Sequence, residues 1–224
     1  MDTAKIELLG IDRVLRRGTG EIVERREGAL LVYDSVSGAY MLGCEDPEAG
    51  AEVLRRDLKS DCRLLMVSDR SLGSETFGRY GFCGMMECRQ AAYYGPEPVL
   101  SGNLAIREAR EEDLAMLTAS YDLVSADEMR RIVERKKLVI GSEGGRTVGF
   151  AGEHLEGSMG LLYVFPEYRR RGYACELEKA VLLRTMREGF VPFGQVEKSN
   201  AASLALQRKL GLAISGDLIC WMWK

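Results

Sequence analysis

The sequence contains only one histidine, His154, among its 224 residues. A single histidine excludes a zinc or iron site built from several histidines. It also argues against a serine–histidine–aspartate triad, because this one residue would have to serve in it. None of the six cysteines forms a Cys-x-x-Cys pair, so zinc-ribbon and thioredoxin motifs are absent as well. We therefore expect no metal ion, and we expect reduced, mostly buried thiols, which are typical of a cytoplasmic protein.

Long apolar runs and a strong charge of one sign are also absent. No stretch of about 20 apolar residues occurs, and charged residues interrupt residues 1–17, so we expect neither a membrane span nor a signal peptide. The 31 basic and 34 acidic residues leave a net charge of −3, which gives no broad positive field. We expect a cytoplasmic protein that binds neither nucleic acid nor membranes.

Hydrophobic residues make up 46% of the chain, which is enough to bury a core. Strand and helix patterns alternate, which predicts an α/β protein with a mixed sheet of the α+β kind. The predicted helices cover residues 4–17, 46–58, a segment ending near 80, 111–120, a segment opening at 125, 173–189 and 203–211. The predicted strands cover residues 29–35, 39–43, 62–68, 83–94, 104–110, 137–141, 146–155, 158–165, 190–197 and 218–224.

A linker over residues 94–103, rich in proline and glycine, divides the chain. It predicts a first domain over residues 1–98 and a second over residues 103–224. Residues 76–87 and 206–217 share a pattern of helix end, glycine, apolar residues and strand. A chance match and an internal duplication both explain this similarity.

The most informative segment is residues 161–174, LLYVFPEYRRRGYA. A buried strand is expected to end at Pro166, and a basic turn then enters a helix. The first N–H groups of a helix have no partner inside it, so this helix start suits a phosphate or pyrophosphate. Gly172 has no Cβ to block an anion, and the arginines before it add positive charge. The alternative is a solvated basic turn.

This segment resembles the signature of the GNAT superfamily of acyl-CoA-dependent N-acyltransferases. Val164, Pro166 and Arg169 match the family's V-x-P-x-x-R motif. Arg169, Gly172 and Ala174 match the loop motif Q/R-x-x-G-x-G/A that precedes a long helix.

Two further segments extend the resemblance over residues 104–224. Residues 200–212 match the motif N-x-x-A/S-x-x-L and the Leu-Gly that follows it. Residues 106–117 match the family's first strand and helix, I-R-x-A-x-x-x-D-L.

Within the superfamily, residues 166–172 and 191–203 are most similar to glycine N-acyltransferase and its bacterial relatives. The resemblance implies a GNAT fold with a catalytic domain over residues 103–224. It also implies a reduced GNAT-like half over residues 1–98, which lacks the loop motif and binds no second CoA.

The resemblance further implies that acetyl-CoA is the cosubstrate and lies between the strands at 158–165 and 190–197. Backbone groups of Leu162 and Val164 would pair with its pantetheine arm, and the amides of residues 170–174 would hold its pyrophosphate. The cofactor-binding residues implied are Leu162, Tyr163, Val164, Arg169, Arg170, Arg171, Gly172, Tyr173, Ala174, Asn200 and Ser203. An amine would then attack the thioester directly.

The sequence departs from the family at both catalytic positions. Ser158 stands where the family has its glutamate base, and Gln207 stands where it has a tyrosine acid. The nearest replacement for the base is Glu156, on the same face if the strand extends that far. His154 has a suitable ordinary pKa of about 6.5, Glu153 is expected to face solvent, and a relay through water needs no side chain.

Three functions follow from these observations. The first is an N-acyltransferase that moves an acyl group, acetyl in the simplest case, to the primary amine of a small molecule or an amino acid. The second is an acyl-CoA-binding sensor or interaction module of the same fold, which the two departures suggest. The third, a nucleotide-binding domain, is disfavoured because neither G-x-x-x-x-G-K-S/T nor G-x-G-x-x-G occurs. The sequence leaves both a monomer and a homodimer open, since the first half could take the place of a partner subunit.

Overall fold

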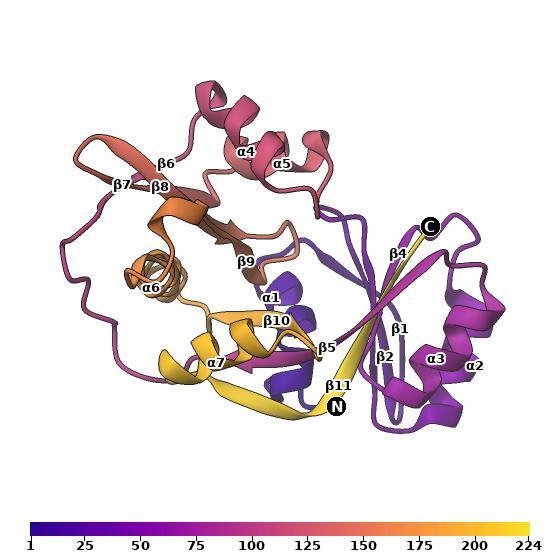
Figure 1. Cartoon of the computed structure of the whole chain (residues 1–224). Helices are drawn as coiled ribbons and strands as arrows, with labels where there is room; N and C mark the ends of the chain where they lie inside the picture. The colour runs from indigo at the N-terminus through magenta and orange to yellow at the C-terminus, as the bar shows by residue number, and fades with distance from the viewer. The chain divides into compact units, whose positions relative to one another are not determined.

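The computed structural model describes all 224 residues, and the chain divides into two compact units (Figure 1). Unit 1 contains residues 1–92, 195–208 and 213–224, and unit 2 contains residues 93–194 and 209–212. The predicted boundary at residues 98–103 differs from this division, because the C-terminal strand pairs with strands of unit 1. The predicted mixed α/β class is confirmed. No helix combines the length and the apolar character that crossing a membrane requires.

Unit 1 is a mixed sheet with helices on both faces. Its strands in spatial order are β1 (Gly20–Arg26), β2 (Ala29–Asp34), β3 (Tyr40–Cys44), β4 (Leu64–Val67), β11 (Ala213–Trp223) and β5 (Gly84–Ala92). β3 and β4 run parallel, and the other neighbours in this series are antiparallel. The helices are η1 (Ile6–Leu8), α1 (Leu9–Arg16), α2 (Pro47–Asp57), α3 (Arg70–Arg79) and α7 (Ala201–Lys209).

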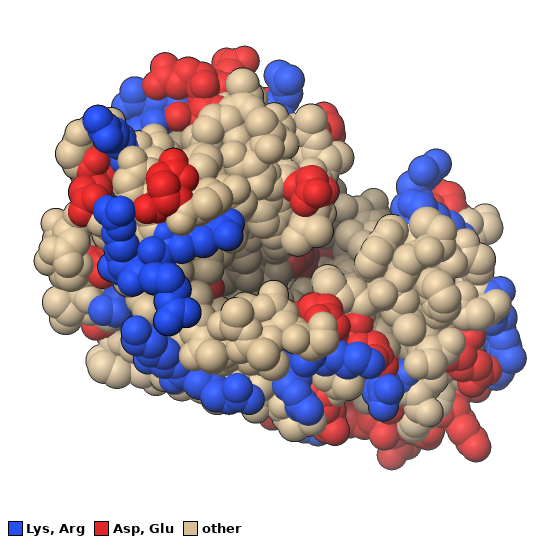
Figure 2. Space-filling model, in the orientation of Figure 1, with Lys and Arg blue, Asp and Glu red and all other residues tan.

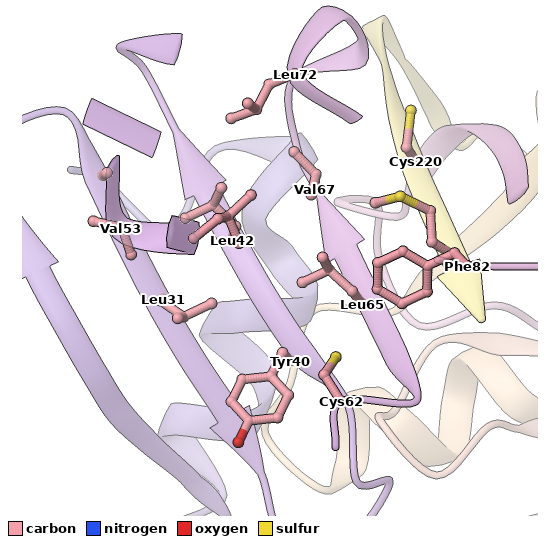
Figure 3. Close-up of a cluster of buried hydrophobic side chains, with 13 residues drawn as sticks. Leu31, Tyr40, Leu42, Val53, Cys62, Leu65, Val67, Leu72, Phe82 and Cys220 are labelled. Atoms are coloured by element: carbon pink, nitrogen blue, oxygen red, sulfur yellow. The ribbon is translucent and has the colours of Figure 1, made fainter. Parts of the chain in front are cut away.

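Two apolar clusters hold the sheet of unit 1 between its helices. On one face, Val53 of α2 and Leu72 of α3 pack in a cluster with strand residues such as Leu42 (Figure 3). On the other face, Ile11 and Val14 of α1 belong to a second cluster. Both α1 residues are fully buried, and each such aliphatic side chain contributes roughly 1.5–3 kcal/mol.

Unit 2 contains β6 (Ala105–Glu108), β7 (Leu138–Glu143), β8 (Arg146–Glu153), β9 (Met159–Val164) and the first residues of β10 (Phe193–Glu197), in that spatial order. Its helices are η2 (Glu111–Asp113), α4 (Leu114–Ser120), α5 (Ala126–Glu134), η3 (Pro166–Tyr168) and α6 (Tyr173–Arg187). α6 packs against β7, β8 and β9, and Figure 1 shows α4 and α5 on the other side of these strands.

One order of elements occurs twice along the chain. The series β1-β2-β3-α2-β4-α3-β5 is followed by the series β7-β8-β9-α6-β10-α7-β11. In each series the first three strands are antiparallel, and the third and fourth are parallel. Residues 76–87 and 206–217 occupy corresponding positions in the two series, which favours an internal duplication over a chance match. The last strand of the second series, β11, lies between the last two strands of the first.

Most predicted elements are confirmed, with two main differences. β1 was not predicted, because its residues are mostly charged and only partly buried. β11 begins at Ala213, five residues before the predicted strand at 218–224, because the pairing with β5 is irregular between Ile214 and Leu218. Arg89 donates to the carbonyls of Ser215 and Gly216 within this irregular stretch, so the usual alternation of side chains is lost there.

A buried carboxylate anchors the turn between β2 and β3. Asp34 is fully buried and accepts hydrogen bonds from Arg17 at 2.9 Å, from the Thr19 hydroxyl at 2.6 Å, and from the N–H and hydroxyl of Ser37 at 2.9 and 2.6 Å. Burial by itself raises the pKa of Asp34, but the bonds from Ser37 and Thr19 and the charge of Arg17 together lower it. The predicted hairpin therefore rests on charge-assisted bonds as well as on its turn residues.

Replacing Asp34 tests this anchor. Asp34→Asn should lower the free energy of unfolding by about 3 kcal/mol, because it leaves buried donors without their charged acceptor. Since the pKa of Asp34 lies below its ordinary 3.8, its stabilisation is present above that value and is lost as the pH falls through the folded pKa. Urea unfolding at neutral pH and near pH 3 measures both effects. The exposed control Asp61→Asn should change little, and equal stability of the two variants would contradict the role of Asp34.

Candidate functional site

The outer edge of β9 is open in unit 2. β9 pairs with β8 along its length, whereas its parallel register with β10 consists of one pair, Met159 opposite Gly194. In the first series, by contrast, the corresponding strands β3 and β4 form three consecutive pairs. The two strands that were predicted to flank the ligand are therefore paired only at their start.

The backbone of β9 presents alternate residues to this open edge. The N–H of Phe165, directly after the strand, donates to the carbonyl of Val148 at 3.0 Å, on the side of β8. Because neighbouring residues of a strand point their backbone groups to opposite sides, Val164 faces away from β8. The open edge can accept an extended chain of amides as an added strand would pair with it.

A β-bulge in β9 includes Leu161 and Leu162. Between Gly160 and Tyr163, β9 has one residue more than the facing stretch of β8. Leu161 at this bulge is fully buried and has a positive φ of 53°. Burial raises the pKa of the Tyr121 phenol, with the Leu161 backbone opposing the shift, so the phenol stays protonated. Bulges of this kind redirect the strand next to functional sites.

The basic loop leads from β9 into an uncapped helix. Arg170 and Gly172 both adopt positive φ values, 65° and 86°. Gly172 is the N-cap of α6, so no side chain caps the first N–H groups of the helix. A Cβ built on Gly172 would meet nothing within 4 Å, so open space lies in front of the helix start. This arrangement suits an anion, as the loop sequence predicts.

The loop arginines differ in what they contact. Arg169 donates through Nε to the carbonyl of Val164 at 2.9 Å, and its guanidinium lies 5.8 Å from the centre of the Tyr163 ring. Arg170 makes no ion pair in the structure, and its charge is therefore available to a ligand. Figure 2 shows basic side chains gathered on the surface over α6.

Arg171 and Tyr173 are both tied to Glu143 at the end of β7. The Tyr173 hydroxyl donates to the Glu143 carboxylate, and Arg171 lies 3.8 Å from the same carboxylate. Arg171 also donates to the carbonyl of Glu167 at 3.1 Å and stacks over the Tyr168 ring at 5.4 Å. The hydrogen bond to Glu143 raises the pKa of Tyr173. Arg171 therefore shapes the loop through protein contacts.

The corresponding helix of the first series is closed to an anion. The carboxylate of Asp46 caps α2 by accepting from the N–H groups of Glu48 and Ala49, at 2.9 and 3.4 Å. The edge of β3 is closed as well, because Ser68 donates its N–H to Leu42 and its hydroxyl accepts from Cys44. Neither a free backbone edge nor a free helix start remains there.

The predicted base candidates lie in the turn between β8 and β9. β9 begins at Met159, so Glu156 is a turn residue rather than a strand residue on the face of Ser158. The two are nevertheless in contact, since the Ser158 hydroxyl donates to a carboxylate oxygen of Glu156. Glu156 is 7% exposed and Ser158 is 1% exposed. The His154 ring lies over Gly160, where a Cβ would come within 2.6 Å of Nε2.

Glu128 of α5 is a half-buried carboxyl that the sequence analysis did not single out. Burial is the main cause that raises its pKa, the nearby carboxylate of Glu156 raises it further, and His154 and Arg131 oppose the shift. The sequence signal at this position is the capping pattern that opens at Ser125. Ser125 does accept from the Glu128 N–H at 3.1 Å, but the Glu128 carboxyl does not cap in return.

Glu153 is a structural residue, and the expectation that it faces solvent is wrong. It is 3% exposed, accepts from the Thr185 hydroxyl at 2.5 Å, and lies 3.2 Å from the ammonium group of Lys137. The carboxylate thereby ties β8 to α6. Side chains alternate between the two faces of a strand, and this alternation assigned Glu153 to solvent. The assignment fails because α6 covers that side of β8.

The predicted cofactor-binding residues fall into two groups. Those of β9, the basic loop and the start of α6 lie together in unit 2, whereas Asn200 and Ser203 lie in unit 1. The Asn200 side chain accepts from the Ser203 N–H at 3.0 Å, so this pair forms the start of α7. No group of three or more His, Cys, Asp or Glu side chains is arranged to hold a metal ion.

Comparisons with known proteins agree on the fold. Residues 143–222, which include the open edge, the loop and the start of α6, match the family described as FR47-like protein. A Drosophila protein superposes with a TM-score of 0.71 at 16% identity, over 100% of this chain and 90% of that chain. A GNAT-family acetyltransferase from Novosphingobium aromaticivorans gives 0.60 at 18% identity, over 96% of each chain. A GCN5-related N-acetyltransferase from Kribbella flavida gives 0.61 at 12% identity, over 99% of this chain and 95% of that chain.

The chain has the GNAT fold. The GNAT resemblance of the sequence motifs is thereby confirmed, while the closer similarity to glycine N-acyltransferase stays a prediction. No curated protein matches the sequence significantly. Within this GNAT fold, the candidate site consists of the β9 edge, the loop before α6 and the turn at residues 154–158.

The raised pKa of Glu128 predicts a loss of stability with rising pH. The folded chain disfavours the carboxylate, so the free energy of unfolding should fall as the pH rises from about 4.5 through the folded pKa. The glutamine in Glu128→Gln cannot ionise, so this fall in the free energy of unfolding should be smaller in the variant than in the wild type. The difference should be on the order of 1 kcal/mol, allowing for partial solvent screening. Urea unfolding near pH 4.5 and pH 7.5 measures it. The exposed control Glu134→Gln should keep the wild-type dependence, and an unchanged dependence in Glu128→Gln would contradict the assignment.

Proposed function

We propose that this GNAT-fold chain is an N-acyltransferase that moves an acetyl group from acetyl-CoA to the primary amine of a small molecule or an amino acid. The proposal is carried by the combination of the open β9 edge with the uncapped start of α6 in one unit. The edge suits an extended arm with amide groups, and the helix start suits a pyrophosphate. CoA joins these two features in one molecule.

Different residues of unit 2 are expected to bind different parts of CoA. The backbone of Leu162 and the N–H of Val164 are placed to pair with the pantetheine arm, since Arg169 already occupies the Val164 carbonyl. The N–H groups from Gly172 to Ala174 are placed to hold the pyrophosphate, with the charge of Arg170 beside them. Arg169, Arg171 and Tyr173 act by keeping the strand end and the loop in shape.

The reaction needs a deprotonated amine and a stabilised oxyanion. The amine nitrogen forms a bond to the thioester carbon, the carbon–sulfur bond breaks, and the thiolate leaves and takes up a proton. Glu156 is the candidate that accepts the proton of the amine, because it is buried and already held by Ser158. His154, in the same turn, is the second candidate.

The first series of elements binds no second CoA in this proposal. Asp46 fills the start of α2 and Ser68 closes the edge of β3, so both features that suit CoA are missing. One acetyl-CoA is therefore expected per chain. The acceptor is a small amine, and neither nucleic acid nor a membrane takes part.

A binding role without efficient catalysis is the second candidate. It is favoured by Ser158, a fully buried serine at the position where the family has its glutamate base. In that case CoA compounds bind but no amine is acetylated. An amine screen for thiol release separates this acyl-CoA sensor from an enzyme.

Ligand-dependent thermal unfolding tests the proposal. CoA and acetyl-CoA at about 100 times their dissociation constants should raise the Tm by about 5–10 °C, whereas ATP should not. Gly172→Asp should abolish the rise by placing a charge and bulk against the pyrophosphate. Gly189→Asp, at the other end of α6, is a matched control, since its φ of 85° and open surroundings resemble those of Gly172. No rise in the wild type, or an unchanged rise in Gly172→Asp, would overturn the site.

Glu156→Gln tests the base. It should slow turnover by about 100-fold at neutral pH while leaving the Tm rise with CoA nearly unchanged, because general-base catalysis is lost and binding is not. The measurement is thiol release with an accepted amine from about pH 6 to about pH 9. Turnover equal to that of the wild type over this range would show that Glu156 is not the base.

A further inference from the structure

A cavity lies at the outer edge of the unit 2 sheet, where residues of β6 and α5 line it together. Its volume is about 530 Å³, which is in the usual range for sites that bind small molecules. β7 and β8 lie between β6 and β9 in the sheet, so this cavity is separate from the open β9 edge. The proposed function does not use it.

The cavity has an apolar inner part and a firmly held wall. Ala109 and Val133 are buried and Leu114 is half-buried, so these three side chains line the inner part. On the wall, Arg107 donates to both carboxylate oxygens of Asp113 at 2.7 Å. These hydrogen bonds lower the pKa of Asp113, so the carboxylate stays ionised and the wall keeps its shape at neutral pH.

Lys136 lines the cavity from a strained backbone position. It follows the end of α5 with a φ of 56°, and its N–H donates to the carbonyl of Val133 at 2.8 Å. Glycine is the usual residue at such a helix end, because a Cβ disfavours the left-handed conformation. The other non-glycine residues with positive φ are Leu161 and Arg170, and both belong to the candidate CoA site. Backbone strain of this kind is concentrated at ligand sites, which points to a use for the Lys136 side chain.

The charges around the cavity are balanced and loosely paired. Besides Arg107, the charged lining consists of three cationic and three anionic side chains: Arg110, Arg130, Lys136, Glu108, Glu111 and Glu134. Glu108 lies 3.8 Å from Lys136 and 3.9 Å from Arg184. Arg110 lies 3.8 Å from Glu112, so each of these ion pairs is long. The charged groups are therefore free to turn towards a ligand.

Arg130, Glu111 and Glu134 make no hydrogen bond or ion pair through their side chains. A ligand with a net negative charge would meet the three glutamates, and one with a net positive charge would meet the three cationic side chains. A ligand that carries one charge of each sign meets a partner for both. The charge balance of the lining therefore favours a zwitterion.

We propose that this cavity binds a free amino acid with an apolar side chain. The guanidinium of Arg130 suits the carboxylate of the ligand, and Glu111 and Glu134 suit its ammonium group. The apolar side chain of the ligand suits the inner part of the cavity, which Leu114 and Val133 line. The amino acid is bound there without being acetylated, because β7 and β8 separate the cavity from β9.

A series of three probes tests the ligand class. L-phenylalanine, added to the full chain, should shift the amide NMR signals of residues 107–114 and 130–136 until they saturate. L-phenylalaninamide lacks the carboxylate and hydrocinnamate lacks the ammonium group, so each should bind about fivefold more weakly, the loss expected for one exposed ion pair. Equal affinity of either analogue, or no binding of L-phenylalanine, would overturn the proposal.

Arg130→Gln tests the position of the carboxylate. It should weaken the binding of L-phenylalanine by about fivefold. The matched control is Arg135→Gln, which removes an exposed arginine at the end of the same helix that does not line the cavity. Unchanged affinity in Arg130→Gln, or an equal loss in the control, would contradict the assignment.

Lys136→Gly separates a ligand role from a structural one. Glycine relieves the strain at this position, so the Tm should rise by about 2–4 °C, whereas the affinity for L-phenylalanine should fall. A variant that keeps full affinity would overturn the role of Lys136. These measurements use neither CoA nor turnover, so their failure would leave the proposed function standing.

Discussion

The edge of β9 that β10 leaves unpaired after Met159 is the constraint on which the rest of the site depends. Backbone N–H and C=O groups need partners when they are buried, so an open edge inside a fold persists only where something else meets it. The bulge at Leu161 turns the strand just before this edge, and Arg169 takes up the carbonyl of Val164 at its end. The loop that follows leads directly into the uncapped α6. A ligand with amides at one end and phosphates at the other meets these requirements together.

The two series of elements show how small changes decide whether such a site exists. Each has three antiparallel strands, a helix and a parallel strand, but the first series is closed at every position where the second is open. Asp46 places a carboxylate at the start of α2, where α6 has only Gly172. Ser68 hydrogen-bonds to the edge of β3, whereas the corresponding edge of β9 is free. A side chain that caps a helix stabilises it by about 1 kcal/mol and at the same time removes its affinity for anions. The first series therefore has the more satisfied backbone, and the second has the proposed ligand site.

The buried carboxyls of unit 2 also differ in whether their contacts stabilise the fold or suit a reaction. Glu153 is a buried carboxylate with two partners, and it ties β8 to α6. Glu156 is also buried, and it accepts from the Ser158 hydroxyl instead of pairing with a cation. A carboxyl held in this way is the kind of group that the proposed reaction needs as a proton acceptor. Ser158, read alone as the loss of a base, gains a role through its bond to Glu156.

Local signals in the sequence predict the elements and the loop, whereas the pairing of the elements follows from tertiary packing. Asp46-Pro47, Ser37-Gly38 and Gly172 act through neighbours along the chain, so the helix start, the hairpin and the open loop were predictable from local signals. The pairing of β11 between β4 and β5, the mostly charged edge strand β1 and the burial of Glu153 depend on residues far away in the sequence. Local propensities act over a few residues, whereas strand order and the burial of a carboxylate such as Glu153 are set by the packing of the whole unit.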